Sequence, residues 1–206
     1  PPHRALGKAA VAAADGDFVM GTAGAGYGAM AGGLKGGTGS ASVVTSDGYT
    51  VGAIVAVNSW GSVIAPGGCS FWAAPYELAG EFGGLGSAGL RAGPDEWGSA
   101  KRAFEARNTT IACVATDAIL TPAQAKRVAV MAQDGFARAI RPVHAPFDGD
   151  VVFAISTGRR PVADDFTLAR LGALAADTLA RAIARGVFEA KPWPDAYVPC
   201  WGDLPA

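Results

Sequence analysis

The sequence predicts an α/β fold in which helices are layered on a sheet, in a single domain over residues 1–206. Two observations support this prediction. After Asn108 the chain alternates apolar, β-branched runs, at residues 111–116 and 151–157, with segments that carry apolar residues at helical spacing. The composition, with 50% hydrophobic and 17% charged residues, is that of a globular chain with a substantial core.

The first 40 residues contain a predicted helix and a glycine-rich segment. Residues 4–14 are rich in alanine and favour a helix, which is expected to end at Asp15-Gly16-Asp17. Residues 21–40 are rich in glycine, which lets a backbone approach another backbone or a ligand closely. The spacing of a phosphate-binding loop is absent, because Lys35 follows Leu34 rather than a glycine.

A strand pair and a long loop are expected next. Residues 42–45 and 49–57 have the composition of two strands joined by a hairpin turn. The continuous apolar run at residues 51–57 predicts a strand buried on both faces. Residues 66–98, rich in glycine and proline and without a clear period, predict a long loop, and residues 97–107 predict a short helix.

Two helices are expected in the second half. Thr121-Pro122-Ala123-Gln124 has the form of a capping box with proline at the first helical position, and the apolar face that follows continues to Ile140. Residues 165–185 predict a second amphipathic helix, with Gly186 as its stop. The tail over residues 191–206 contains proline and tryptophan and is expected to pack on a surface.

Charge and composition exclude several classes of function. A net charge of −1 does not favour nucleic acid or an anionic membrane as a partner, and no apolar run of 18 residues is present. The three cysteines have no paired metal-binding spacing. No signal peptide is visible, which favours the cytoplasm, but the sequence begins at Pro1 without methionine, so an N-terminal segment is expected to be missing.

The most informative segment is Asn108-Thr109-Thr110, which enters an apolar strand directly. Cleavage between Asn108 and Thr109 would place a hydroxyl nucleophile and a free α-amine on one residue, a recognised way to activate a threonine. Two other interpretations stay open: an N-glycosylation acceptor, and a strand that simply begins with residues of high β-propensity.

Four further polar residues could support such a nucleophile. Asp148 and Asp150 precede a strand two positions apart, so their carboxylates can point the same way and influence each other's protonation. Lys35 is the only cation in the glycine-rich segment and would favour a deprotonated hydroxyl. Asn58 ends a buried strand and could donate its amide to an oxyanion. His144, near the carboxylates, suits a metal site or a triad, or is an ordinary loop histidine.

Together these segments resemble the self-processing L-aminopeptidase/D-esterases and β-peptidyl aminopeptidases, and most of all the nylon-oligomer (6-aminohexanoate-oligomer) hydrolases among them. The aminopeptidase branch usually has serine as nucleophile and a Ser/Glu pair in place of Asp148 and Asp150. The matching stretches are Gly24-Ala25-Gly26, Lys35-Gly36-Gly37-Thr38-Gly39-Ser40, residues 51–58, Asn108-Thr109-Thr110-Ile111, Ala115-Thr116-Asp117, Arg141-Pro142-Val143-His144 and Asp148-Gly149-Asp150.

The resemblance implies a four-layer αββα sandwich of the N-terminal-nucleophile type, which cuts itself before Thr109 and assembles as a tetramer of processed protomers. Residues 1–108 would be the C-terminal part of the first fragment, and residues 109–206 the second. The family also has an earlier glycine-rich region and an active-site tyrosine that have no counterpart here, so the chain is expected to lack its N-terminal part.

The resemblance further implies the roles of the site residues. Thr109 would be the nucleophile, Asn58 the oxyanion amide, Lys35 a neighbouring cation, and Asp148 and Asp150 the acidic pair. The expected activity is hydrolysis of the amide bonds of nylon oligomers through an acyl-enzyme, without metal or organic cofactor. Two alternatives stay open: an aminopeptidase acting on short peptides or β-peptides, and a non-catalytic scaffold protein that stays uncut.

Overall fold

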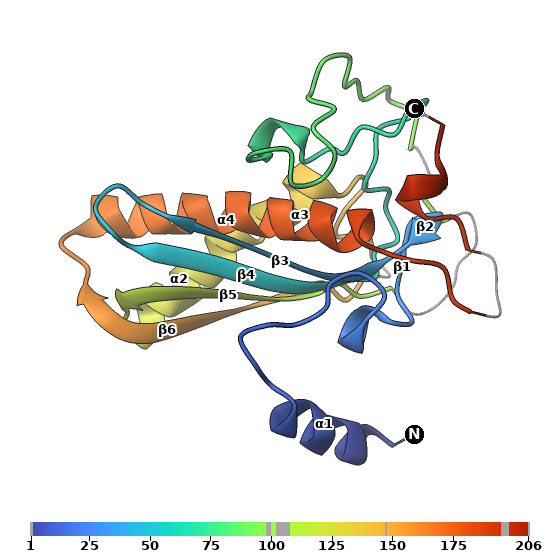
Figure 1. Ribbon diagram of the computed structural model, residues 1–206. Coiled ribbons are helices and arrows are strands. Elements are labelled where there is room, and N and C mark those ends of the chain that lie inside the picture. Colours follow the sequence, from blue (N-terminus) through green and yellow to red (C-terminus); the bar gives the residue numbers. More distant parts are fainter. Residues whose placement is uncertain (1, 98–99, 102–107, 147, 195–197, 206) are drawn as a thin grey trace.

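The computed structural model describes residues 2–97, 100–101, 108–146, 148–194 and 198–205. One four-stranded sheet, in the order β3-β4-β5-β6, is covered on one face by three helices (Figure 1). The strands are β3 (Gly37–Val44), β4 (Thr50–Val57), β5 (Ile111–Ile119) and β6 (Val151–Pro161), and the covering helices are α2 (Pro122–Ala132), α3 (Asp134–Ala139) and α4 (Asp165–Phe188). The expected α/β class is confirmed: in the described residues one helix layer covers the four-stranded sheet, and a small two-stranded sheet lies beside it.

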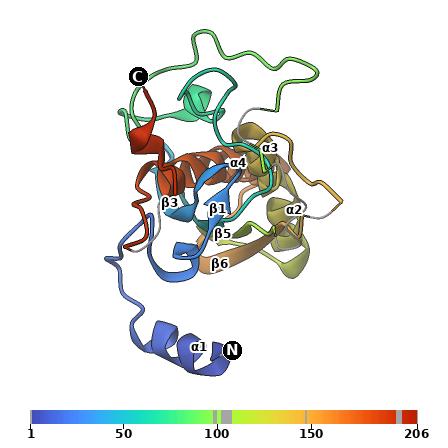
Figure 2. The same ribbon diagram turned by 90° about the vertical axis from the view of Figure 1, so that its right-hand side faces the viewer.

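The smaller elements lie around this sheet. β1 (Met30–Ala31) and β2 (Leu34–Lys35) form a two-stranded sheet. Helix α1 (His3–Ala12) confirms the first predicted helix, but it buries no residue and stands away from the sheet, on the side opposite the loop of residues 66–98 (Figures 1 and 2). The described residues also form three short 3₁₀ helices: η1 (Gly24–Gly26), η2 (Ala74–Tyr76) and η3 (Trp201–Asp203).

The sheet mixes antiparallel and parallel pairs. β3, β4 and β5 are antiparallel neighbours, whereas β5 and β6 are parallel. A parallel pair needs a crossover connection, and α2 with α3 provides it. The predicted capping box is confirmed, because Thr121 Oγ1 accepts from Gln124 N at 3.3 Å and Gln124 Oε1 accepts from Thr121 N at 2.9 Å. The single helix expected from Thr121 to Ile140 is two helices, and in the second Gly135 lies directly against α4.

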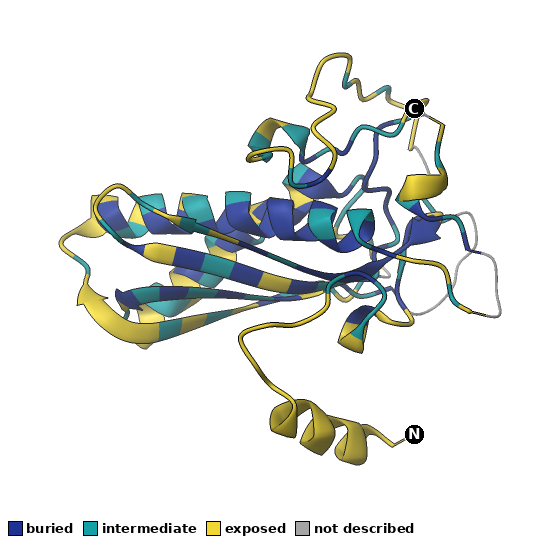
Figure 3. Cartoon of the chain, viewed as in Figure 1, coloured by how far each residue is buried: buried dark blue, intermediate teal, exposed yellow. Residues whose placement is uncertain are grey.

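The prediction that residues 51–57 are buried on both faces is wrong. Along β4, Val51 and Val55 are buried beneath α4, while Ile54 on the opposite face is 43% exposed. Within the described residues nothing covers this second face as α4 covers the first, so its apolar side chains remain exposed (Figure 3). They include Ile54, Ile111, Phe153 and Ile155.

Glycines explain two further differences from the predicted elements. β3 begins at Gly37 rather than at residue 42, and α4 continues past Gly186 to Phe188. A Cβ on Gly186 would lie 2.9 Å from Gly39 N, and one on Gly39 would lie 1.9 Å from Ala182 O. These glycines therefore let α4 and the edge strand β3 pack backbone to backbone. Close packing of helix and strand thus explains Gly186 and Gly39, in place of a helix stop or a ligand-binding loop.

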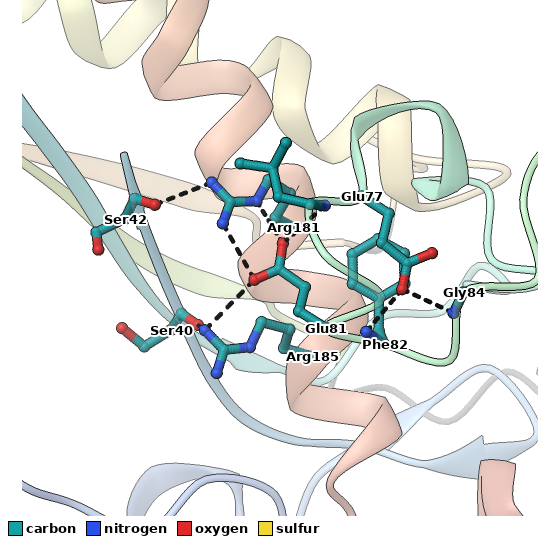
Figure 4. A network of polar contacts seen from close by, with 9 residues as sticks. Ser40, Ser42, Glu77, Glu81, Phe82, Gly84, Arg181 and Arg185 are labelled. Atoms are coloured by element: carbon teal, nitrogen blue, oxygen red, sulfur yellow. Dashed lines mark hydrogen bonds and ion pairs between the residues drawn. The ribbon is translucent and has the colours of Figure 1, made fainter. Parts of the chain in front are cut away.

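A polar network around the buried Arg181 fastens the predicted loop of residues 66–98 to the sheet and to α4 (Figure 4). Arg181 donates from Nε and Nη2 to the two carboxylate oxygens of Glu81, at 2.5 and 3.0 Å. Its Nη1 donates to Ser42 O at 3.0 Å, and Arg185 Nη1 donates to Ser40 O at 2.6 Å. The two arginines thus donate hydrogen bonds to carbonyl groups on the outer edge of β3, which would otherwise be open to pairing with another strand.

The tail packs on the molecule as expected, since the Trp201 ring stacks on Phe71 with centroids 5.4 Å apart. The predicted helix at residues 97–107 falls mostly outside the described residues. Cys69, Cys113 and Cys200 are all free thiols. In the described ranges no helix has both the length and the apolar character needed to cross a membrane.

Candidate active site

A cavity of about 1090 Å³ opens at one end of the sheet. The topology gathers its residues: β4 ends at Val57, antiparallel β5 begins at Ile111, and β6, parallel to β5, begins at Val151. The end of β4 and the starts of β5 and β6 therefore meet at the same edge. Polar residues lining the cavity include Asn58, Lys101, Asn108, Thr109 and Asp148.

The Asn108–Thr109 peptide bond is intact in this structure, so the geometry is that of the uncut chain. Thr109 Oγ1 donates to Asn108 O at 2.6 Å, which places the hydroxyl beside the carbonyl it was predicted to attack. Gly149 N donates to the same carbonyl oxygen at 3.0 Å. Lys101 Nζ donates to the Asn108 side-chain oxygen at 2.7 Å, and Asn108 itself is 2% exposed. Asn108 is thus held through its carbonyl oxygen by Thr109 and Gly149, and through its side chain by Lys101.

Gly149 lies so close to the Thr109 hydroxyl that its position leaves no room for a side chain. A Cβ there would lie 2.7 Å from Thr109 Oγ1, closer than ordinary contact. Its N–H is also the donor that polarises the Asn108 carbonyl, at a distance suited to stabilising an oxyanion. No role for Gly149 was predicted from the sequence, although its position between two aspartates is a signal that points to it.

The two aspartates occupy different environments. Asp148 lines the cavity; its Oδ2 accepts from Ala145 N at 3.3 Å, while its Oδ1 is buried and has no hydrogen bond within the described part of the chain. Asp150 lies behind the cavity wall, with its side chain 3% exposed and Oδ1 accepting from Thr110 N at 2.9 Å. Burial raises the pKa of Asp150, the Thr110 N–H opposes this, and the neighbouring Asp148 raises the pKa further.

Asn58 contacts Thr109 through its backbone as well as lining the cavity. Its carbonyl oxygen accepts from Thr109 N at 3.0 Å. Its side-chain Oδ1 accepts from Met30 N at 3.0 Å, which fixes the orientation of the amide group. The predicted oxyanion role of this amide stays a prediction.

Lys35 is fully buried and does not line the cavity. Its ammonium donates to Gly26 O at 3.1 Å, Ala29 O at 2.9 Å and Gly36 O at 2.7 Å. Burial lowers the pKa of Lys35 to about 8, with a smaller opposing effect from Cys200. The hydrogen bonds of the Lys35 ammonium in the described residues go to backbone carbonyls and not to Thr109. One of these carbonyls belongs to Ala29, which lines the cavity, so Lys35 supports the cavity wall through the backbone.

Lys101 is the second residue that the sequence analysis missed. It precedes the candidate cut by several residues, within the segment 97–107 that was predicted to be a short helix, and no local pattern indicated that its ammonium would reach Asn108. As for metals, no group of three or more His, Cys, Asp and Glu side chains in the described residues is arranged to hold an ion.

The chain has close relatives among curated proteins. It is 41% identical over 222 residues to a protein of Mycobacterium bovis and to one of Mycobacterium tuberculosis, in each case covering 98% of this chain and 62% of the relative. A Mycobacterium leprae protein is 43% identical over 198 residues, covering 89% of this chain and 52% of the relative. All three are named as uncharacterised aminopeptidases. The chain therefore spans somewhat over half the length of these relatives.

Solved structures share the fold, each with a TM-score of 0.61. A protein from Pyrococcus horikoshii is 30% identical, covering 90% of this chain and 49% of that one. The L-aminopeptidase D-Ala-esterase/amidase of Ochrobactrum anthropi, described as a variant of the Ntn-hydrolase fold, is 25% identical, covering 89% and 48%. A Burkholderia β-aminopeptidase is 26% identical, covering 89% and 50%. A family profile matches residues 3–196, so this chain belongs to peptidase family S58.

Proposed function

We propose that this chain carries the nucleophile of an amide hydrolase that activates itself by cutting between Asn108 and Thr109. One observation carries the proposal: the Thr109 hydroxyl lies 2.6 Å from the Asn108 carbonyl oxygen, which also accepts the Gly149 N–H. A nucleophile beside a carbonyl that is already polarised has the two elements that acyl transfer needs.

In the first stage, Thr109 Oγ1 attacks the Asn108 carbonyl carbon, and the hydroxyl proton passes to a base. Asp148 is the proposed base, because it lines the cavity and its buried Oδ1 has no hydrogen bond in the described residues. The negative charge that develops on Asn108 O is stabilised by the Gly149 N–H. The C–N bond then breaks as the nitrogen of Thr109 takes up a proton, and water hydrolyses the resulting ester.

In the second stage, the freed α-amine of Thr109 is the base. The amine nitrogen is already held by the Asn58 carbonyl at 3.0 Å in the uncut chain, so its position is set before the cut. Removal of the Asn108 carbonyl frees the Gly149 N–H for a substrate carbonyl, with the Asn58 amide as a second donor. The hydroxyl attacks the substrate amide, the amine of the substrate leaves, and water hydrolyses the acyl-enzyme.

For the substrate we propose a short peptide or another amide with a free amino group. The Asp148 carboxylate in the cavity suits a substrate ammonium, and the mycobacterial relatives are named as aminopeptidases. A second candidate is the 6-aminohexanoate oligomer, which is favoured by one observation: Thr109 with Asp148 and Asp150 departs from the serine nucleophile and Ser/Glu pair of the aminopeptidase branch. Assembly of the processed protomers as a tetramer is part of the same proposal.

The decisive experiment is the intact mass of the purified full-length protein beside a Thr109→Ala variant. Two fragments that meet at Asn108 and Thr109 in the wild type, with one uncut chain in the variant, are expected. Release of a chromophore from an alanine anilide, compared with cleavage of a 6-aminohexanoate oligomer, then distinguishes the two substrate classes. A wild-type chain that stays uncut and hydrolyses neither substrate would overturn the proposal and favour the scaffold alternative.

A further inference from the structure

The imidazole of His144 contacts the buried carboxylate of Asp150, a contact that the mechanism above does not use. His144 Nδ1 lies 3.4 Å from Asp150 Oδ2, and the two side chains are 46% and 3% exposed. An ionised carboxylate only accepts hydrogen bonds, so Nδ1 is the nitrogen that carries a proton in this contact. The second oxygen of Asp150 accepts from Thr110 N, which follows the nucleophile directly.

The backbone of His144 is in a conformation that serves this contact. Its φ is +55°, which lies in the left-handed region. Among the non-glycine residues of the described chain, only Ala79 also has a positive φ. Few non-glycine residues adopt such angles, and those that do concentrate at functional sites. The ring also meets the buried Phe136 of α3 edge to face, with centroids 5.9 Å apart, so the imidazole is held between α3 and the carboxylate.

We propose that His144 is a positioning residue for the nucleophile: its Nδ1–H holds Asp150 so that the second carboxylate oxygen fixes the Thr110 N–H. That N–H belongs to the peptide group joining Thr109 to Thr110, so the contact sets the orientation of the backbone that carries the hydroxyl. The inference rests on the proposed function of Thr109. It gives Asp150 a role distinct from that of Asp148, since Asp148 lines the cavity and Asp150 acts from behind it.

The charges around Asp150 indicate why a donor is needed there. Burial and the neighbouring Asp148 raise the pKa of Asp150, while the His144 imidazole and the Thr110 N–H lower it. The cavity cation Lys101 is directed at the Asn108 side chain, and α3 contributes the uncharged Phe136 ring. Without the imidazole donor, Asp150 would keep its proton to higher pH and hold Thr110 less firmly.

Two substitutions separate the donor from the backbone conformation. In His144→Asn the amide nitrogen is attached to Cγ, as Nδ1 is in histidine, so the donor is kept, and asparagine tolerates a positive φ. In His144→Gly the positive φ is kept and the donor is lost. Both variants lose the ring that packs on Phe136, so any effect of packing alone is the same in the two.

Self-cleavage of the full chain is measured for both variants across pH. The Asn variant is expected to cut within about threefold of the wild-type rate, and the Gly variant about tenfold to a hundredfold more slowly, because a slightly misplaced nucleophile loses rates of this order. The acidic limb of the rate profile is expected at higher pH in the Gly variant than in the Asn variant. Equal rates and equal profiles for the two variants would overturn the inference.

A second readout does not depend on cleavage. In chains kept uncut by Thr109→Ala, the Asp150 carboxyl is titrated by carbon NMR with His, Asn or Gly at residue 144. A higher midpoint with Gly than with Asn or His is expected, and identical midpoints would contradict the role of His144. If the wild-type chain fails to cut itself, the proposed function fails, and this titration still decides whether His144 holds Asp150.

Discussion

Replacing Gly149 by alanine is expected to slow self-cleavage by about tenfold to a hundredfold, without loss of the folded state. The new Cβ would lie 2.7 Å from Thr109 Oγ1, whereas ordinary contact begins at 3.4 Å, so the hydroxyl must move by the difference, about 0.7 Å. A displacement of about 1 Å at a reacting atom can cost about a hundredfold in rate, which corresponds to about 2.7 kcal/mol. Since alanine keeps the N–H, the loss reports the position of the hydroxyl alone.

The assay follows, by intact mass after synthesis of the precursor, the appearance of two fragments that meet at Asn108 and Thr109. Gly68→Ala is the matched control, because a Cβ on Gly68 meets no atom within 4 Å. Adding Thr109→Ser to Gly149→Ala should restore part of the rate, since serine lacks Cγ2 and its hydroxyl can change rotamer. A Gly149→Ala chain that cuts at the wild-type rate would refute the proposed arrangement of nucleophile and carbonyl.

Three further predictions concern stability, measured by urea unfolding. Lys35→Met should lower the free energy of unfolding by about 3 kcal/mol at pH 7, because three buried carbonyls lose their donor. The pKa of Lys35 is about 8 in the folded chain, whereas its ordinary value is 10.5. Between these two pH values the unfolded chain therefore binds more protons than the folded chain. The free energy of unfolding of the wild type should rise with pH across this window, relative to that of the Met variant. Glu81→Gln should cost about 3 kcal/mol, because it leaves the charge of Arg181 buried without its carboxylate. Gly186→Ala should cost about 2 kcal/mol, because the added Cβ would lie 2.9 Å from Gly39 N.

Matched controls exist for the last two changes. Asp177→Asn removes the partner of Arg138 in an ion pair whose side chains are 28% and 36% exposed, and it should cost less than about 1 kcal/mol. Gly7→Ala adds a Cβ that meets no atom within 4 Å, so it should change stability by less than about 1 kcal/mol. Equal losses in each variant and its control would show that burial and close packing are not the causes. A wild-type pH dependence identical to that of Lys35→Met would contradict the lowered pKa.

Local patterns in the sequence predicted those elements whose stabilising contacts are close along the chain. The capping box at Thr121 and Gln124 joins residues three positions apart, and it forms as expected. The four strands of the main sheet were placed correctly, but their ends and burial were less accurate, and β1 and β2 were not predicted. β3 extends into the glycine-rich segment because Gly39 meets a helix far along the chain, and the exposure of Ile54 depends on what covers the sheet. Neither the contact of Gly39 with the helix nor the exposure of Ile54 can be recognised from the neighbouring sequence.

The candidate site divides in the same way. The sequence by itself determined which chemical groups are available: a hydroxyl at Thr109, two carboxylates at Asp148 and Asp150, and the family to which their order belongs. Only the tertiary structure decided that Asp148 lines the cavity while Asp150 lies behind it, and that Gly149 donates to the Asn108 carbonyl. The physical reason is that residue types and spacings fix local chemistry and periodicity, whereas direction and burial are set where distant strands meet at one edge of the sheet.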